Sequence, residues 1–399
     1  MIYKLQDLQH NNTKISYKIF WLIFLFEFFS PIYDILFYTT HINLTQLAKI
    51  PILGLFFITI VFHIRRKIIC SIETWILIIF GLFSFVYGLF ENMAINRYFA
   101  THVYLVIMPI FSISYGIYFA RDISNSIYIY YRRVMKIAFG LTVFYLILYA
   151  YLYHVKGAIT YFGFGSYMPF VCTYLLPSGH YWASLVGFAL VVISGKRSTL
   201  VLMCVVFLAF YVKQFFYKKG RTIIALLFML ALGILGFRYA EKKGYFSRIV
   251  TTINMDFSDD QSMFLATSGR WQEIQGVIKY LNSKYYRWII GAGMGSHYVI
   301  ERPDIKESEL SHYAHFSPLS YTFIFGLPMA LLLYLALIKK VIWSLSKANY
   351  MFPLAFIMFF VNSIFGATIL VDPKTWFFLG VVTEMRREFQ NKKSWPLPS

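Results

Sequence analysis

Apolar segments long enough to cross a lipid bilayer recur along almost the whole chain. Runs such as "KIFWLIFLFEFFSPIYDILFY" and "IETWILIIFGLFSFVYGLF" match the roughly 20 residues that a transmembrane helix needs. Only 14% of the 399 residues are charged, whereas soluble domains carry about 25%. The strands of a membrane β-barrel would alternate apolar and polar residues instead. We therefore expect an all-α polytopic membrane protein.

Twelve ranges of the sequence have the length and apolar character of membrane spans. The predicted spans are 16–38, 43–62, 69–90, 102–120, 134–153, 158–177, 179–193, 198–216, 221–239, 317–338, 350–370 and 374–386. The range 158–177 contains Gly, Pro and Ser, so it either spans the membrane or re-enters it as a broken helix.

The basic segments orient these spans. Segments such as "HIRRK", "YKKGR" and "RREFQNKK" belong in the cytoplasm by the positive-inside rule. Twelve crossings with both chain ends in the cytoplasm satisfy every basic segment except "SGKRST", residues 194–199. Lys196 and Arg197 are therefore expected at the external membrane face, as a cationic site or as side chains that extend toward lipid phosphates.

The predicted topology divides the chain into three parts. Residues 1–239 hold spans 1 to 9, residues 240–316 form a large external (periplasmic) loop, and residues 317–399 hold spans 10 to 12 and a cytoplasmic tail. The net charge of +19 is typical of cytoplasmic loops in such a protein and does not indicate nucleic-acid binding. The bilayer itself is the first expected partner.

The external loop has the composition of a folded segment, because aromatic residues are spread through it. The stretch "SGRWQEIQGVIKYL" predicts a helix over 268–281, with Ser268 as its N-cap. In "GAGMG", residues 291–295, the glycines lack the strand and helix context of a phosphate-binding loop. We expect a tight turn there that returns the loop to the membrane.

Two histidines lie where the loop re-enters the membrane. His312 and His315 are three residues apart, so they would share one face if this segment is helical. Gly326 follows His315 by eleven residues, about three helical turns, and would let a helix or a lipid chain approach closely. Histidine is suited to take a proton from a hydroxyl near neutral pH. The alternative is a histidine that only forms structural hydrogen bonds at the interface.

The cationic residues on the same side of the membrane fit a phosphate ligand. Arg197 and Arg270, together with Lys196, are candidates for binding a diphosphate leaving group, because arginine stays charged and matches phosphate with paired donors. An acidic D-x-D cluster is missing near these residues, so we expect neither a catalytic metal nor another cofactor.

Three stretches of the sequence resemble the O-antigen polymerase (Wzy) and O-antigen ligase superfamily of bacterial membrane glycosyltransferases. "SGKRSTLVLM" resembles the family's arginine motif at the start of a transmembrane helix. "SGRWQEIQGVIKYLNSKYYRWIIGAGMGS" is similar to its S-G-R helix followed by G-x-G, and "HFSPLSYTFIFGLP" matches its His-x10-Gly spacing. Together they cover roughly residues 178–340.

The resemblance implies a GT-C-like fold and a metal-independent transfer from undecaprenyl diphosphate in the bacterial inner membrane. Arg197 and Arg270 would hold the diphosphate, and His315 would be the base, with His312 as the alternative. A polymerase would move a growing glycan onto the non-reducing end of a lipid-linked repeat unit during lipopolysaccharide biosynthesis. Its expected partners are the lipid-linked oligosaccharide donor and acceptor, a flippase and a chain-length regulator.

Two other functions stay open on the sequence. An O-antigen ligase would use the same donor with a lipid A–core acceptor, although Phe316 after the histidine differs from the Asn, Ser or Gln usual in ligases. A flippase or secondary transporter also often has twelve spans, but it predicts two similar halves, which the sequence does not have.

Overall fold

A computed structural model of the chain describes residues 18–25, 50–64, 66–92, 96–122, 125–156, 167–194, 197–215, 263–264, 267, 269–302, 307–366 and 372–391. This part of the chain is mainly helical, as the sequence predicts. A short helix covers residues 18–25. The next helices are α3 (Ile50–His63), α4 (Ile72–Asn92), α5 (Arg97–Arg121), α6 (Asn125–Lys156), α7 (Tyr167–Leu175), α8 (Tyr181–Ser194) and α9 (Arg197–Phe215).

The second half of the described chain adds further helices and one hairpin. They are α13 (Arg270–Asn282), α14 (Tyr286–Ile290), β1 (Tyr298–Arg302), β2 (Glu307–Ser311), α15 (Ser317–Phe325), α16 (Leu327–Ser346), α17 (Met351–Gly366) and α19 (Pro373–Gln390). The two strands pair antiparallel, with Tyr298 opposite Ser311. In the described residues, the expectation of an all-α fold therefore holds except for this hairpin.

Each predicted span that the structure describes contains at least part of a helix, and 221–239 lies outside the described residues. Three of these helices are long and apolar enough to cross a membrane, namely α4, α5 and α16. They indicate a membrane protein, while the count of twelve spans stays a prediction. For the range 158–177, only α7 and its end are described, so spanning and re-entry both remain open.

The predicted span 317–338 is wrong over residues 317–326. The helix that starts at Ser317 ends at Phe325, and the candidate span α16 begins at Leu327. Gly326 separates the two with a φ of 91°, a left-handed value that a continuing helix cannot contain. Pro328, in the first turn of α16, marks a helix start. α15 is therefore a short helix of its own, and its residues 320–325 are buried.

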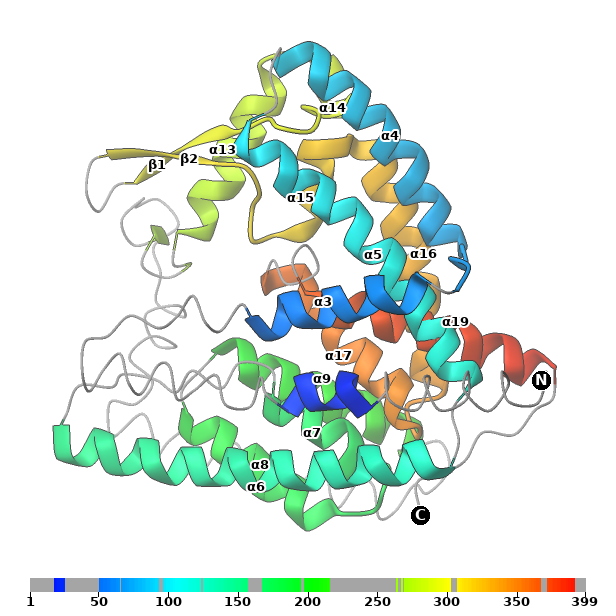
Figure 1. Cartoon of the computed structure of the whole chain (residues 1–399). Coiled ribbons are helices and arrows are strands. Elements are labelled where there is room, and N and C mark those ends of the chain that lie inside the picture. The colour runs from blue at the N-terminus through cyan, green and yellow to red at the C-terminus, as the bar shows by residue number, and fades with distance from the viewer. Residues whose placement is uncertain are drawn as a thin grey trace.

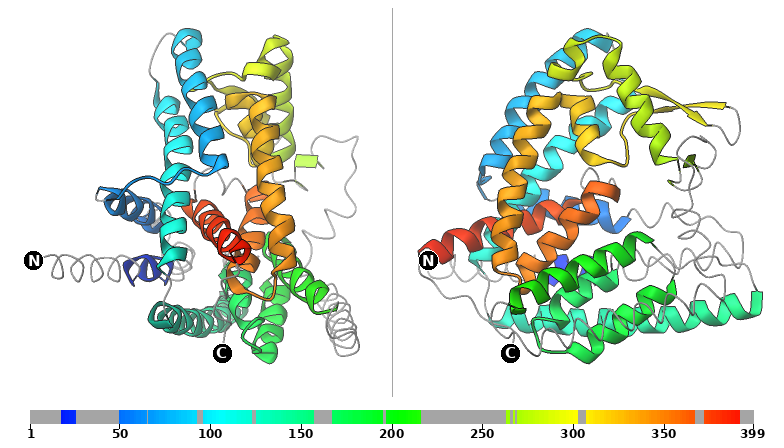
Figure 2. Two further views of the ribbon diagram at one scale, coloured as in Figure 1. Left: turned by 90° about the vertical axis from the view of Figure 1, so that its right-hand side faces the viewer. Right: turned by 180° about the vertical axis from the view of Figure 1, so that it is seen from behind.

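The helices form three groups (Figure 1). α6 to α9 lie at one end, α3, α17 and α19 cross the middle, and α4, α5 and α16 extend from the middle to the other end. There they meet α13 to α15 and the hairpin, an arrangement that the turned views also show (Figure 2). The described elements of the predicted external loop, α13, α14 and the hairpin, thus lie at one end of the three candidate spans.

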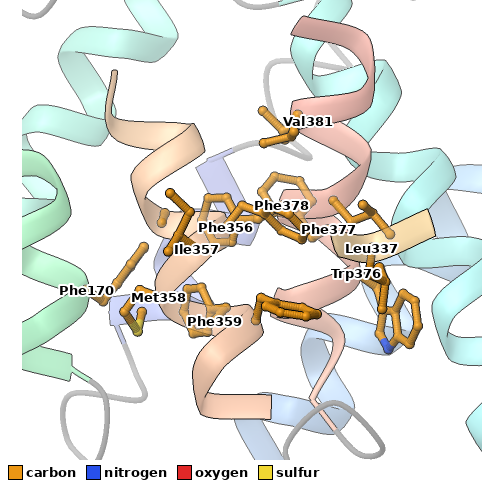
Figure 3. Packing of buried hydrophobic residues seen from close by; sticks show 14 of the residues in the cluster. Phe170, Leu337, Phe356, Ile357, Met358, Phe359, Trp376, Phe377, Phe378 and Val381 are labelled. Carbon is orange, nitrogen blue, oxygen red and sulfur yellow. The ribbon is translucent and has the colours of Figure 1, made fainter. Parts of the chain in front are cut away.

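The core of the middle group is made of aromatic and aliphatic side chains (Figure 3). α17 and α19 face each other there, and the rings of Phe359 and Phe378 stack with centroids 5.2 Å apart. Phe170 of α7 packs on the same pair. The shared core joins the lower helices to α19, which in turn packs along α5.

Two glycines allow α5 and α19 to cross at close range. A Cβ added at Gly116 would lie 2.1 Å from the backbone oxygen of Phe377, and one at Gly380 would lie 2.1 Å from that of Ile113. Small residues at such a crossing bring helix backbones together and increase their van der Waals contact. The ion pair between Arg121 and the buried Glu384, at 2.9 Å, joins the same two helices further along.

We predict that Gly116→Ala destabilises the protein, because its methyl group has to displace backbone atoms of α19. Overpacking of this kind costs about 1–3 kcal/mol. The matched control is Gly140→Ala in α6, where an added Cβ meets nothing within 4 Å. Thermal unfolding of the detergent-solubilised protein measures both variants. A lower midpoint is expected for Gly116→Ala only, and equal midpoints would contradict the crossing.

Candidate functional site

The segment between β2 and α15, residues 312–316, is not helical. The expectation that His312 and His315 share a helix face is therefore wrong. Pro318 in the first turn of α15 favours a helix start at this point. The Ser320 hydroxyl fixes the segment from inside α15, since it accepts from the Ala314 N–H at 2.6 Å and lies 2.7 Å from the Ala314 carbonyl oxygen.

His315 forms a close pair with a carboxylate of α13. Its Nδ1 lies 2.7 Å from Oε1 of Glu273, and its backbone N–H donates to Oε2 of the same carboxylate at 2.8 Å. The His315 side chain is 43% exposed, whereas that of Glu273 is 14% exposed. The carboxylate thus holds both the backbone and the ring of His315 and leaves the remaining part of the ring accessible.

The contact with Glu273 determines which ring nitrogen of His315 is available to accept a proton. An ionised carboxylate only accepts hydrogen bonds, so Nδ1 carries the proton that it donates to Glu273. In the neutral imidazole, Nε2 then has the free lone pair. A base oriented by a carboxylate in this way recurs in catalytic triads on unrelated folds.

Arg270 stands at the start of the helix that carries Glu273. It is the first residue of α13, is exposed, and precedes Glu273 by three residues, which places both on neighbouring positions of the helix surface. The structure therefore brings two regions together that are more than 40 residues apart in the sequence, namely "SGRWQEI" and "HYAHFSP".

The start of α13 differs in one detail from the prediction. Gly269, with a φ of 80°, is the N-cap residue and supplies no side-chain hydrogen bond. Ser268, the expected N-cap, lies outside the described residues. The Thr267 hydroxyl accepts from the Trp271 N–H at 3.2 Å and so serves one of the first backbone donors of the helix.

Lys196 and Arg197, the other predicted cationic residues, are not placed relative to the His315–Glu273 pair. Lys196 lies outside the described residues, and Arg197 is described only as the first backbone position of α9. Residues 197–199 form the first turn of α9, which begins one residue before the predicted span 198–216. The expected role of these two residues in diphosphate binding stays a prediction.

His312 has different surroundings from His315. Its ring stacks on Tyr98 with centroids 4.8 Å apart and lies 5.7 Å from the ring of His102. Its backbone carbonyl accepts from Nε2 of His102 at 3.1 Å. The ring of His312 thus packs against aromatic rings of α5, and the ring of His315 contacts the carboxylate of Glu273.

The stretch "GAGMG" forms a tight turn, as expected. Gly291, Gly293 and Gly295 have φ values of 79°, 83° and 89°. Its backbone N–H groups are bonded within the protein: Ala292 to Phe323 O, Gly293 to Ile324 O, Met294 to Ser84 O and Gly295 to Nδ1 of His102. With these donors occupied by α4, α5 and α15, the turn does not offer the free N–H groups of a phosphate loop.

His102, which the sequence analysis did not single out, joins this turn to the histidine segment. Its buried ring accepts from Gly295 N at 2.9 Å and donates from Nε2 to His312 O. Asn96 adds a second link, because its side chain caps the N-terminus of α5 and also donates to Gly295 O at 2.8 Å. The start of α5 thus fixes the turn in place, and through His102 also the segment leading to His315.

Gly326 does not lie beneath His315 on a shared helix. It sits at the corner between α15 and α16, where a Cβ would lie 2.1 Å from the Ile289 oxygen and 3.1 Å from the Gly291 nitrogen. The close approach expected at this glycine does occur. Its partner is a separate helix, as one of the two expected alternatives had it, because Ile289 belongs to α14 and Gly291 directly follows that helix.

The chain matches no family model, no curated protein and no solved structure. The contact between His315 and Glu273 is therefore the observation from which a function can be inferred.

We predict that His102→Phe releases the glycine turn, because the buried Gly295 N–H and His312 carbonyl both lose their partner. An unsatisfied buried polar group costs about 1–3 kcal/mol. Hydrogen-exchange mass spectrometry of the peptides over 291–296 measures the loss of protection. The matched control is His297→Phe, since His297 is exposed. Unchanged protection in His102→Phe would contradict the role of His102.

Proposed function

We propose that the chain is a membrane glycosyltransferase that extends a lipid-linked polysaccharide, with His315 as its base. The observation that carries the proposal is the contact of the half-exposed His315 ring with Glu273, one helical turn from Arg270. A base, its orienting carboxylate and a phosphate-binding cation are the groups that sugar transfer from a diphosphate carrier requires.

Glu273 gives the imidazole its direction and supports its charge. The carboxylate keeps the proton on Nδ1, so Nε2 is the atom that receives a proton from the acceptor hydroxyl. The imidazolium that forms is stabilised by the adjacent negative charge, as in other His–carboxylate pairs. Because Glu273 also binds the His315 backbone N–H, the ring stays aligned before and after proton transfer.

The transfer step then needs no additional reactant. The hydroxyl of the acceptor sugar loses its proton to Nε2 of His315 as its oxygen bonds to the anomeric carbon of the donor glycan. The bond between that carbon and the diphosphate oxygen breaks, and undecaprenyl diphosphate leaves with the electron pair. Arg270 would neutralise the negative charge that develops on the diphosphate. Lys196 and Arg197 would contribute to this neutralisation if "SGKRST" lies at the same membrane face.

The proposed setting is the external face of the bacterial inner membrane. Twelve spans with a GT-C-like arrangement would place residues 240–316 in the periplasm, next to a repeat unit that a flippase has delivered. A chain-length regulator would be the second functional partner. The chemistry described for His315 requires neither a metal nor a cofactor.

We predict that His315→Ala and Glu273→Gln each lower glycan extension by roughly 10²- to 10⁴-fold, the usual contribution of a positioned general base. His315→Ala removes the base, and Glu273→Gln allows the unproductive tautomer. The assay is gel analysis of products from purified protein and undecaprenyl-diphosphate-linked repeat units, in EDTA. These substrates are extracted from cells that lack the gene.

Glu301→Gln is the matched control. Glu301 is likewise paired with a basic side chain, Lys279 at 2.9 Å, but both groups are largely exposed on the hairpin side. The hydrogen bond from Lys279 lowers the pKa of Glu301, so it is ionised like an ordinary carboxylate. Full extension by His315→Ala would contradict the proposal. Transfer to lipid A–core without extension of repeat units would identify a ligase.

A further inference from the structure

α4 and α16 pack against each other, and each exposes an apolar face. We call these two faces together the apolar wall. On α4 it consists of Ile72, Trp75, Ile79, Leu82, Phe83, Val86 and Phe90, each 49% or more exposed. On α16 it consists of Leu327, Leu331, Leu332, Leu335, Ile338, Ile342 and Leu345. The spacing of three and four residues puts each set on one helix face. Both helices are candidate membrane spans, so lipid chains are the natural cover of this wall.

The short helix α14 sits at the end of the wall where α4 ends and α16 begins (Figure 1). Arg287 of α14 donates to Glu91, in the last turn of α4, at 2.9 Å. At the other side, the Ile289 carbonyl packs against Gly326, which directly precedes α16. α14 is therefore fixed to the ends of both helices.

The outward side of α14, together with Lys284 and Tyr285 just before it, combines apolar, aromatic and basic groups. Ile289 is 64% exposed and Tyr285 is 90% exposed. Tyr286 is also exposed, and the ammonium of Lys284 lies 5.7 Å from its ring centre. Tyrosine with a neighbouring lysine is the composition that concentrates at membrane–water interfaces, where the ring is in the apolar layer and the polar groups meet headgroups.

The charges of this surface favour phosphate headgroups. Glu91 is the only carboxylate that the described ion pairs bring to α14, and it is shared by Arg287 and by Lys284 at 3.6 Å. Two cations against one carboxylate leave a net positive charge at the end of the wall. Anionic or zwitterionic phospholipids supply the complementary phosphate groups.

We propose that α14 is an interfacial helix that lies in the bilayer surface at the Phe90 end of α4. Its occupant is the phospholipid layer that also covers the apolar wall, with Ile289 directed into the acyl region and Tyr285 and Lys284 at the headgroups. The hairpin of β1 and β2, on the far side of α13 from α4 and α16 (Figure 2), stays in water. α14 thereby sets the depth at which the start of α15 and the residues before it meet the membrane.

The test is a depth measurement with nitroxide labels in phosphatidylcholine–phosphatidylglycerol bilayers. Single cysteines replace Ile289, Phe83 and Val299 in a Cys70→Ser, Cys204→Ser background, because the third cysteine, Cys172, is buried. All three labelled side chains are exposed, at 64%, 49% and 49%, so the fold tolerates the labels. Electron paramagnetic resonance compares collisions with oxygen, which enters the bilayer, and with a nickel chelate, which stays in water.

We expect the label at 289 about 5–10 Å below the headgroup phosphates, the depth of interfacial helices. The label at 83 should be deeper, and the label at 299 should collide several-fold more often with the nickel chelate than with oxygen. A label at 289 as accessible to nickel as that at 299 would overturn the proposal, and so would burial of 299 in lipid. The measurement needs no substrate, so its result is independent of the proposed enzymatic activity.

Discussion

Backbone that is neither helix nor sheet must find hydrogen-bond partners inside the protein when it lies against apolar helices. The turn at 291–296 meets this requirement with donors bonded to α4, α5 and α15. Its glycines permit the approach, because a Cβ at Gly293 would lie 2.8 Å from the Cα of Gly88. The turn therefore anchors α13, α14 and the hairpin to the candidate spans, and the position of Glu273 relative to His315 depends on this anchoring.

Two histidines have complementary roles in that arrangement. His102 is buried and uses both ring nitrogens to connect backbone groups of the turn and of the histidine segment. His315 uses Nδ1 for Glu273 and keeps its other ring nitrogen on an accessible side chain. The first is typical of structural histidines and the second of histidines that transfer protons. Sequence alone does not separate these two cases.

The sequence predicted the helices because their apolar runs are long, and it predicted α13 and the glycine turn because their local signals are strong. It placed the helix boundary at 317 correctly but missed the break at Gly326. Only the φ of 91° shows that the chain changes direction at this glycine. Glu273 was missed because its partner lies 42 residues further along the chain. Its position in the first turn of an S-G-R helix was the one available signal. The hairpin was missed because its strands are only five residues long and β2 is mostly polar.

The central claim is that Glu273 holds His315 with the proton on Nδ1. Nitrogen-15 NMR of the protein in bilayers, labelled at histidine and assigned with His315→Ala, reports the protonation of each ring nitrogen directly. We expect the neutral imidazole of His315 to have a protonated Nδ1 and an unprotonated Nε2, and to lose this preference in Glu273→Gln. A proton on Nε2 in the unmodified protein, or a spectrum that Glu273→Gln leaves unchanged, would contradict the account.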